Sequence, residues 1–209
     1  MKKGSSVVIR ILWLALALSA TEVCAENYDP LAVSPAPLPA PVELTMHDAA
    51  RNRGVPLRIY LPANTTPEPV ILFSHGLGGS RTGSAPREGG AGKAFGAVKI
   101  PWLLMTGTKD IAPIGHEDLK SRLAVYPALQ GAPKYEVVLY NAEHSAFTDR
   151  ALPGDREPRN PNHHRVMLAL STAFWDAYLR GDAGALAWLN GSGPPSVLEA
   201  KDRWQFSAP

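Results

Sequence analysis

Two side chains that could act together in acid–base chemistry each follow a run of apolar residues. Asp110 ends the run KIPWLLMTGTKD, and His144 follows the run YEVVLYNAE. A histidine oriented by a carboxylate can take a proton from a nucleophile, because the carboxylate fixes the tautomer of the ring and stabilises the imidazolium. The segment His75-Gly76-Leu77 follows a third apolar run, and backbone N–H groups in such a glycine-rich turn can stabilise an oxyanion. The sequence therefore contains candidate parts of a nucleophilic catalytic site.

The elements that must position these residues can be predicted from apolar periodicity. Residues 99–110 and 135–149 each begin as a strand and end in a polar loop. Residues 115–130 between them have apolar side chains at helical intervals. A strand, a helix and a strand in this order predict parallel pairing with a right-handed crossover. Because open α/β sheets bind ligands at the carboxyl edge of their strands, we expect the candidate residues to meet there.

The remaining elements complete a predicted α/β fold. Residues 42–48 and 56–62 alternate apolar and polar side chains around a turn, which predicts an N-terminal antiparallel hairpin. The run PVILFSHG at 69–76 is apolar on both faces, as in a central strand covered by helices on each side. A long helix is expected at 163–181, introduced by an Asn-Pro-Asn segment and closed by a glycine. We therefore expect a mainly parallel sheet flanked by helices.

Residues 1–25 have the pattern of a secretory signal peptide. Basic residues precede an apolar run at 11–18, and Val23 and Ala25 have the small side chains found before a cleavage site. The alternative, a membrane anchor, disagrees with the length of this run, which is shorter than the ~20 residues that span a bilayer. We therefore expect cleavage after Ala25, a secreted or periplasmic protein, and no stable membrane anchor.

Removal of residues 1–25 would change both the charge and the cysteine count of the chain. Three of its 21 basic residues and one of its 19 acidic residues lie there, so the formal net charge falls from +2 to zero. The mature chain then offers no electrostatic reason to bind nucleic acid, and it has no cysteine for a disulfide, a thiol nucleophile or a metal. Five prolines within residues 26–41 predict an extended linker, which leaves residues 42–209 as a single domain.

Three other polar groups have simpler interpretations than a binding site. The segment HED at 116–118 could suggest a metal, but adjacent residues on a helix point in different directions. A solvated helix start is therefore favoured, and no metal site is predicted. The histidine pair at 163–164 is typical of the exposed first turn of a helix. The mixed-charge segment 149–157 could border a substrate cleft, although a surface loop is the simpler interpretation.

Three segments resemble the α/β-hydrolase superfamily, in particular the dienelactone-hydrolase-like and platelet-activating-factor-acetylhydrolase-like esterases. They are FSHGLGGSR, LLMTGTKD and NAEHSAFTD, and their order agrees with the order of oxyanion loop, acid and histidine in that fold. The resemblance covers most of residues 42–180. It implies an α/β-hydrolase-like domain, a small-molecule ester as substrate and no metal or organic cofactor.

The same resemblance implies roles for individual residues. Asp110 would be the acid of a catalytic triad, and His144 would be its general base. The two are 34 positions apart with one helix and one strand between them, as the last two strands of the fold require. The backbone N–H of Leu77 would stabilise the oxyanion, in a loop shaped by His75 and Gly76.

The nucleophile of that family is missing from the sequence. It is a serine in a G-x-S-x-G turn between a strand and a helix, and the chain has no such pentapeptide. Only 25 positions separate Gly76 from Pro101, whereas one strand–helix–strand unit needs ~30 or more residues. An internal deletion, with a seam near residues 84–94, would explain the gap and would shorten the sheet. A serine elsewhere, such as Ser80 or Ser84, would lack the turn that presents it.

Two functions from different classes follow from these observations. The first is a secreted serine-type hydrolase of carboxylic esters that keeps the oxyanion loop, the acid and the histidine. The alternative is a catalytically inactive truncated hydrolase, or a binding module that keeps the outer parts of the fold.

Overall fold

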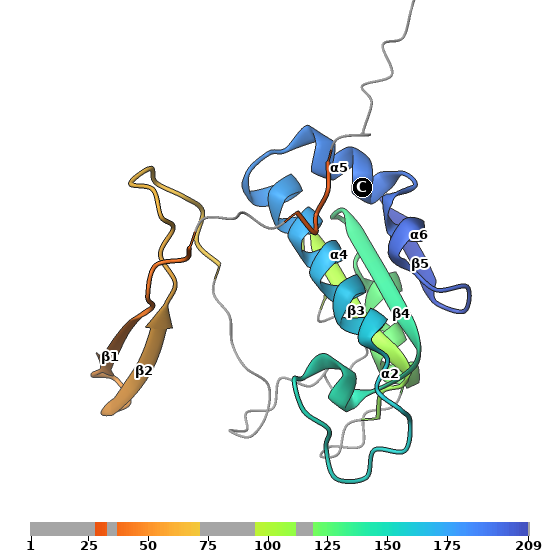
Figure 1. The fold of residues 1–209 in the computed structure, drawn as a ribbon, viewed down its shortest axis with the longest axis horizontal. Coiled ribbons are helices and arrows are strands. Elements are labelled where there is room, and N and C mark those ends of the chain that lie inside the picture. The colour runs from red at the N-terminus through yellow and green to blue at the C-terminus, as the bar shows by residue number, and fades with distance from the viewer. Residues whose placement is uncertain (1–27, 33–36, 72–94, 112–118, 209) are drawn as a thin grey trace, which may run out of the picture.

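A three-stranded sheet lies among the helices in the second half of the chain (Figure 1). The computed structural model describes four parts of the chain, residues 28–32, 37–71, 95–111 and 119–208. The strands of this sheet lie in the order β3 (Trp102–Lys109), β4 (Lys134–Glu143) and β5 (Arg203–Ser207). The predicted parallel pairing of β3 with β4 is confirmed. β5 was not predicted and runs antiparallel to β4, so the described sheet is mixed rather than mainly parallel.

The predicted N-terminal hairpin is confirmed. β1 (Val42–Asp48) and β2 (Arg53–Ile59) pair antiparallel and are drawn at the left of Figure 1. Leu44 pairs with Leu57, and apolar residues two positions away along each strand share their face, since side chains alternate across a strand. Among the described residues this apolar face is largely exposed, and Met46 has 58% of its surface accessible.

The helix predicted at 115–130 is, in its described part, two short helices, α2 (Leu119–Leu123) and α3 (Val125–Ala128). Pro127 explains the break. In one continuous helix Pro127 would lack the N–H that bonds to the carbonyl of Leu123, and its ring would clash with that carbonyl. A new helix that begins at Val125 places the proline in its first turn, where an N–H group would have no partner within the helix.

The helix predicted at 163–181 is observed as α4 (Pro161–Leu179). The side-chain oxygen of Asn160 accepts a hydrogen bond from the N–H of Asn162 at 2.9 Å, and the proline at the first helical position needs no partner for an N–H. Gly181 follows the helix end with a φ of +69°, a conformation that glycine adopts readily. The helix buries side chains at intervals of three and four positions, Val166, Ala169, Leu170 and Ala173.

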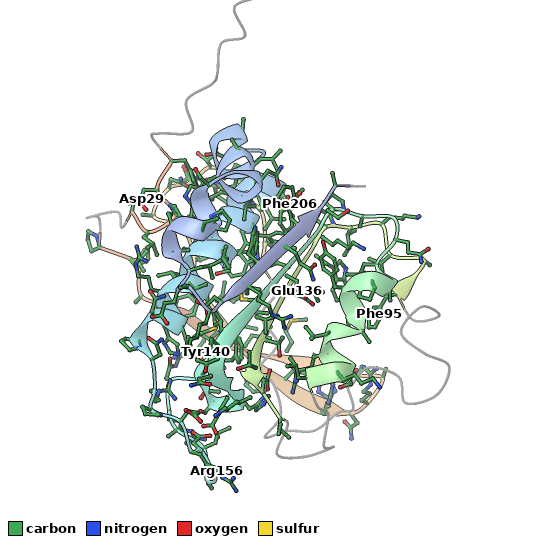
Figure 2. All side chains as sticks on the ribbon, turned by 90° about the vertical axis from the view of Figure 1, so that its right-hand side faces the viewer. Asp29, Phe95, Glu136, Tyr140, Arg156 and Phe206 are labelled. Atoms are coloured by element: carbon green, nitrogen blue, oxygen red, sulfur yellow. The ribbon has the colours of Figure 1, made fainter. Side chains whose placement is uncertain are left out.

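Tyr135 in β4 joins the sheet to the helices. Its ring stacks on Trp204 and Phe206 of β5, with centroid distances of 5.7 and 6.0 Å. Its hydroxyl lies 2.7 Å from the hydroxyl of Tyr178 and 2.9 Å from Oδ1 of Asn190. Burial, and then the hydrogen bond with Tyr178, raise the pKa of the Tyr135 phenol. β5 can be followed in Figure 2, where Phe206 is labelled.

Two short helices that were not predicted, α5 (Ala183–Asn190) and α6 (Gly193–Val197), complete the helical layer. The N-terminal segment contacts this layer, since the hydroxyl of Tyr28 donates to Oδ2 of Asp176 in α4 at 2.7 Å. Burial, and then this hydrogen bond, raise the pKa of Tyr28. One end of the predicted linker at 26–41 therefore packs on the domain.

Several predictions fall on residues that the structure does not describe. The signal peptide and its cleavage site lie within 1–27, and the seam at 84–94 lies within 72–94. Of the strand predicted at 69–76, only residues 69–71 are described, and they are not in a strand. Among the described residues, no helix is both long enough and apolar enough to cross a membrane.

We predict that Gly107→Ala destabilises the domain strongly. A Cβ at this position would lie 2.0 Å from the backbone carbonyl oxygen of Ala142 in the paired strand β4. Neither strand can move away without breaking their pairing, so we expect urea unfolding to show a free energy of unfolding that is about 1–3 kcal/mol lower. Because the closest contact is with a backbone atom, adding Ala142→Gly should not restore stability. Recovery in the double variant would contradict this explanation.

Candidate active site

Asp110 and His144 are in contact at the carboxyl edge of the three-stranded sheet. Oδ1 of Asp110 lies 2.8 Å from Nδ1 of His144. The side chain of Asp110 is 3% exposed, whereas that of His144 is 41% exposed. The structure thus brings together the two residues that the sequence singled out, with the carboxylate buried and part of the imidazole open to solvent.

A bulge in β4 leads the chain from the strand to His144. It lies between two strand pairs, Gly107 with Leu139 and Lys109 with Glu143. β4 has extra residues over this stretch, and Asn141 accommodates them in the left-handed region, with a φ of 56°. The N–H of Asn141 donates to Oγ1 of Thr108 at 2.8 Å. The 3₁₀ helix η2 (His144–Phe147) follows directly, so the histidine stands where the strand ends.

Two hydrogen bonds and one ion pair hold the buried carboxylate of Asp110. Oδ1 is shared by His144 and Arg122, whose Nη2 lies 3.3 Å away, and Oδ2 accepts from Oγ1 of Thr106 at 3.0 Å. Nε of Arg122 also donates to the backbone carbonyl of Asp110 at 3.2 Å. A carboxylate removed from water needs such partners, because an unpaired buried charge is far more costly than one hydrogen bond is stabilising.

Thr106 and Arg122 were not among the predicted site residues. Thr106 could have been found, because it lies in β3 four positions before Asp110, which directly follows that strand, and residues of an extended chain separated by an even number share a face. Arg122 offered no comparable signal. Twelve positions separate the two residues in the sequence, and this spacing does not determine the distance between their side chains.

The loop between η2 and α4 is fastened to residues beside His144. The carboxylate of Glu143 accepts hydrogen bonds from the N–H groups of Arg156 and Glu157, at 3.0 and 3.2 Å. Nη1 of Arg159 donates to the carbonyl of Ser145 at 3.1 Å. Figure 2 shows Arg156 at the outer end of this loop. The mixed-charge loop therefore braces the turn that carries the histidine.

A small cavity lies between this loop, the end of β4 and the start of α4. Its volume is about 20 Å³, and Glu143, Ser145, Arg159 and His163 are among the residues that line it. A cavity of this size has room for one water molecule and not for an ester. His144 does not line it. The mixed-charge loop thus borders a water-sized cavity at Glu157 and Arg159.

The expectation that both histidines at the start of α4 are exposed is wrong for His163. It is 3% exposed, and its Nε2 lies 3.1 Å from the carbonyl oxygen of Tyr140. The first turn of α4 packs against the end of β4, so this ring fills the space between them. His164 is exposed, as expected, and its Nε2 lies 3.1 Å from the carbonyl oxygen of Thr148.

The predicted oxyanion loop lies outside the described residues. This applies to His75, Gly76 and Leu77, and also to the segment HED at 116–118. Within the described ranges, no cluster of three or more His, Cys, Asp or Glu side chains has the arrangement of a metal site.

The nucleophile is not found among the described hydroxyl groups. Among the described residues, His144 forms its hydrogen bond with Asp110. Ser145 is adjacent in sequence but is buried, and its hydroxyl bonds to Asp155. That hydrogen bond, together with one from the N–H of Leu152, lowers the pKa of Asp155. Among the described residues, no hydroxyl group is bonded to His144, whose side chain is 41% exposed.

The chain matches no protein-family model, no curated protein and no solved structure. The resemblance to the α/β-hydrolase superfamily therefore stays a prediction.

We predict that Thr106→Val destabilises the protein by about 1.5–3 kcal/mol, the usual size of a hydrogen bond to a charged group. Valine has nearly the shape of threonine but leaves Oδ2 of Asp110 without its donor. Thr106→Ser keeps the hydroxyl and loses one methyl group, which should cost about 1 kcal/mol. Both variants can be compared by urea unfolding at neutral pH. An equal or larger loss in the serine variant would show that packing, and not the hydrogen bond, makes threonine important here.

Proposed function

We propose that the chain is an exported hydrolase of small carboxylic esters in which His144, oriented by Asp110, is the general base. The observation that supports this proposal is the 2.8 Å contact between the buried carboxylate of Asp110 and Nδ1 of a half-exposed His144. A histidine held in this way has one nitrogen committed to the carboxylate and the other available for proton transfer.

The reaction can be written around Nε2 of His144. With Nδ1–H donating to Asp110, the lone pair on Nε2 takes the proton of an attacking O–H group. The oxygen forms a bond to the ester carbonyl carbon, and the carbonyl electron pair moves to the carbonyl oxygen. When the tetrahedral intermediate collapses, the C–O bond of the alcohol breaks and the leaving oxygen takes the proton from Nε2. Asp110 stabilises the imidazolium between these two transfers.

The attacking group in this proposal is either water or a serine from residues 72–94. No described hydroxyl is bonded to His144, and water on Nε2 requires no further side chain. A serine would form an acyl-enzyme, which the same histidine would then help to hydrolyse. The backbone N–H of Leu77, in the loop with His75 and Gly76, is the proposed donor to the oxyanion.

The proposal can be tested with the purified chain, p-nitrophenyl butyrate and a fluorophosphonate probe. We expect His144→Ala to lower kcat/KM by about 10²–10⁴-fold, the usual contribution of a general base, and Asp110→Asn to have a similar effect. His47→Ala is the matched control, because His47 is exposed in the hairpin, and its activity should be unchanged.

The probe separates the two nucleophiles. Labelling that is lost in His144→Ala identifies a serine, whereas hydrolysis without labelling identifies water. A cooperatively folded sample that neither hydrolyses the ester nor reacts with the probe would contradict the proposal and favour the inactive hydrolase or binding module.

A further inference from the structure

We propose that Arg122 is a positioning residue for the Asp110–His144 pair. In this role it fixes the carboxylate in the position from which it orients the histidine. The inference rests on the proposed function for its effect on rate, although its effect on the geometry of the pair can be measured separately.

Arg122 holds Asp110 at two different points. Its Nη2 meets the carboxylate oxygen Oδ1 at 3.3 Å, and its Nε donates to the backbone carbonyl of the same residue at 3.2 Å. Because the guanidinium group is planar and rigid, these contacts fix the carboxylate relative to its own backbone. The side-chain torsions of Asp110 are thereby restricted from outside. A lysine has a single nitrogen and cannot reproduce both contacts with the same geometry.

Oδ1 is the carboxylate oxygen on which the orientation of His144 depends. It accepts a hydrogen bond from Nδ1 of His144 and forms an ion pair with Arg122, while Thr106 donates to the other oxygen. If Arg122 were absent, Thr106 would still hold Oδ2, but His144 would be the one side chain among the described partners that still holds Oδ1. The 2.8 Å contact to His144 would then lose its fixed direction.

Arg122 also places a positive charge beside the buried carboxylate of Asp110. The side chain of Asp110 is 3% exposed and that of Arg122 is 27% exposed, so solvent screens their attraction only in part. A neutral His144 cannot balance the carboxylate, and Thr106 carries no charge. Arg122 is therefore the cation that compensates the buried carboxylate among its described partners.

A purely structural role for Arg122 is the competing explanation. The residue lies in α2, which packs against β3, and its bond to the backbone carbonyl of Asp110 could serve only to attach the helix to the strand. That role predicts a loss of stability without a change in the environment of the histidine. The two explanations differ in what happens at Nδ1 of His144.

The test compares Arg122→Gln, Arg122→Lys and the control Arg165→Gln in the full chain, since Arg165 is exposed on α4. Histidine labelled with ¹⁵N allows the Nδ1 proton of His144 to be observed by NMR, and His144→Ala assigns it. We expect a slowly exchanging resonance in the unchanged protein and in Arg165→Gln, and its loss in both variants of Arg122. We expect kcat to fall about 10–10²-fold with KM changed less than about twofold, because misplacement affects the transition state more than substrate binding.

Chemical rescue keeps the inference testable if Arg122→Gln folds poorly. Millimolar guanidinium ion added to Arg122→Ala should restore part of kcat and the resonance, whereas the same concentration of ammonium should not. A retained resonance and unchanged kcat in folded Arg122→Lys or Arg122→Gln would overturn the inference. If the unchanged protein shows the resonance and Arg122→Gln loses it, but neither hydrolyses esters, the positioning role stands and the proposed function fails.

Discussion

The burial of one carboxylate at the end of β3 organises the site. Asp110 is 2% exposed, and its charge has to be met by donors within the protein. Those donors come from three separate elements, with Thr106 in β3, Arg122 in α2 and His144 in η2. Because each belongs to a different element, one side chain fixes the relative positions of a strand, a helix and a turn. Of these three side chains, that of His144 is the most exposed. The buried carboxylate therefore also holds an imidazole group at the surface.

The position of the carboxylate depends on β4, which pairs with β3 along the strand that leads to Asp110. Val137 and Val138 are adjacent, so they point to opposite faces of the sheet, and both are at most 2% exposed. Both faces of β4 are therefore covered at this point. The rings around Tyr135 tie one face to α4 and β5. The parallel pairing then brings the ends of β3 and β4 to one edge, where the bulge at Asn141 gives way to the turn with His144.

The sequence allowed the prediction of those parts of the fold with a strong local signal. Two apolar runs predicted β3 and β4, and the Asn-Pro-Asn segment predicted the start of α4, since capping and proline chemistry act within a few residues. β5, α5 and α6 were missed because they are short and depend on long-range packing. The break between α2 and α3 could have been read from Pro127. The burial of His163 could not, because it depends on where the first turn of α4 meets β4.

The candidate site follows the same division. Its central pair was predicted because each member directly follows an apolar run, and parallel pairing makes the ends of such runs neighbours. Arg122 was missed because it belongs to another element than Asp110, and spacing in the sequence alone does not determine such a contact. The hydrogen bonds from the mixed-charge loop to Glu143 were missed for a related reason, since they involve backbone N–H groups that any residue could supply.

The chemistry of the site also depends on where the chain has a core. The hairpin of β1 and β2 exposes most of its apolar face, and a two-stranded hairpin is marginally stable by itself. The buried apolar cluster instead lies among β4, α4, α5 and α6, beside the strand that ends at Asp110. His144 and the carboxylate of Asp110 therefore both belong to the region from β3 to α6. No described hydroxyl group of that region is bonded to His144, and in the proposed reaction the attacking group has to approach this histidine from the side that solvent reaches.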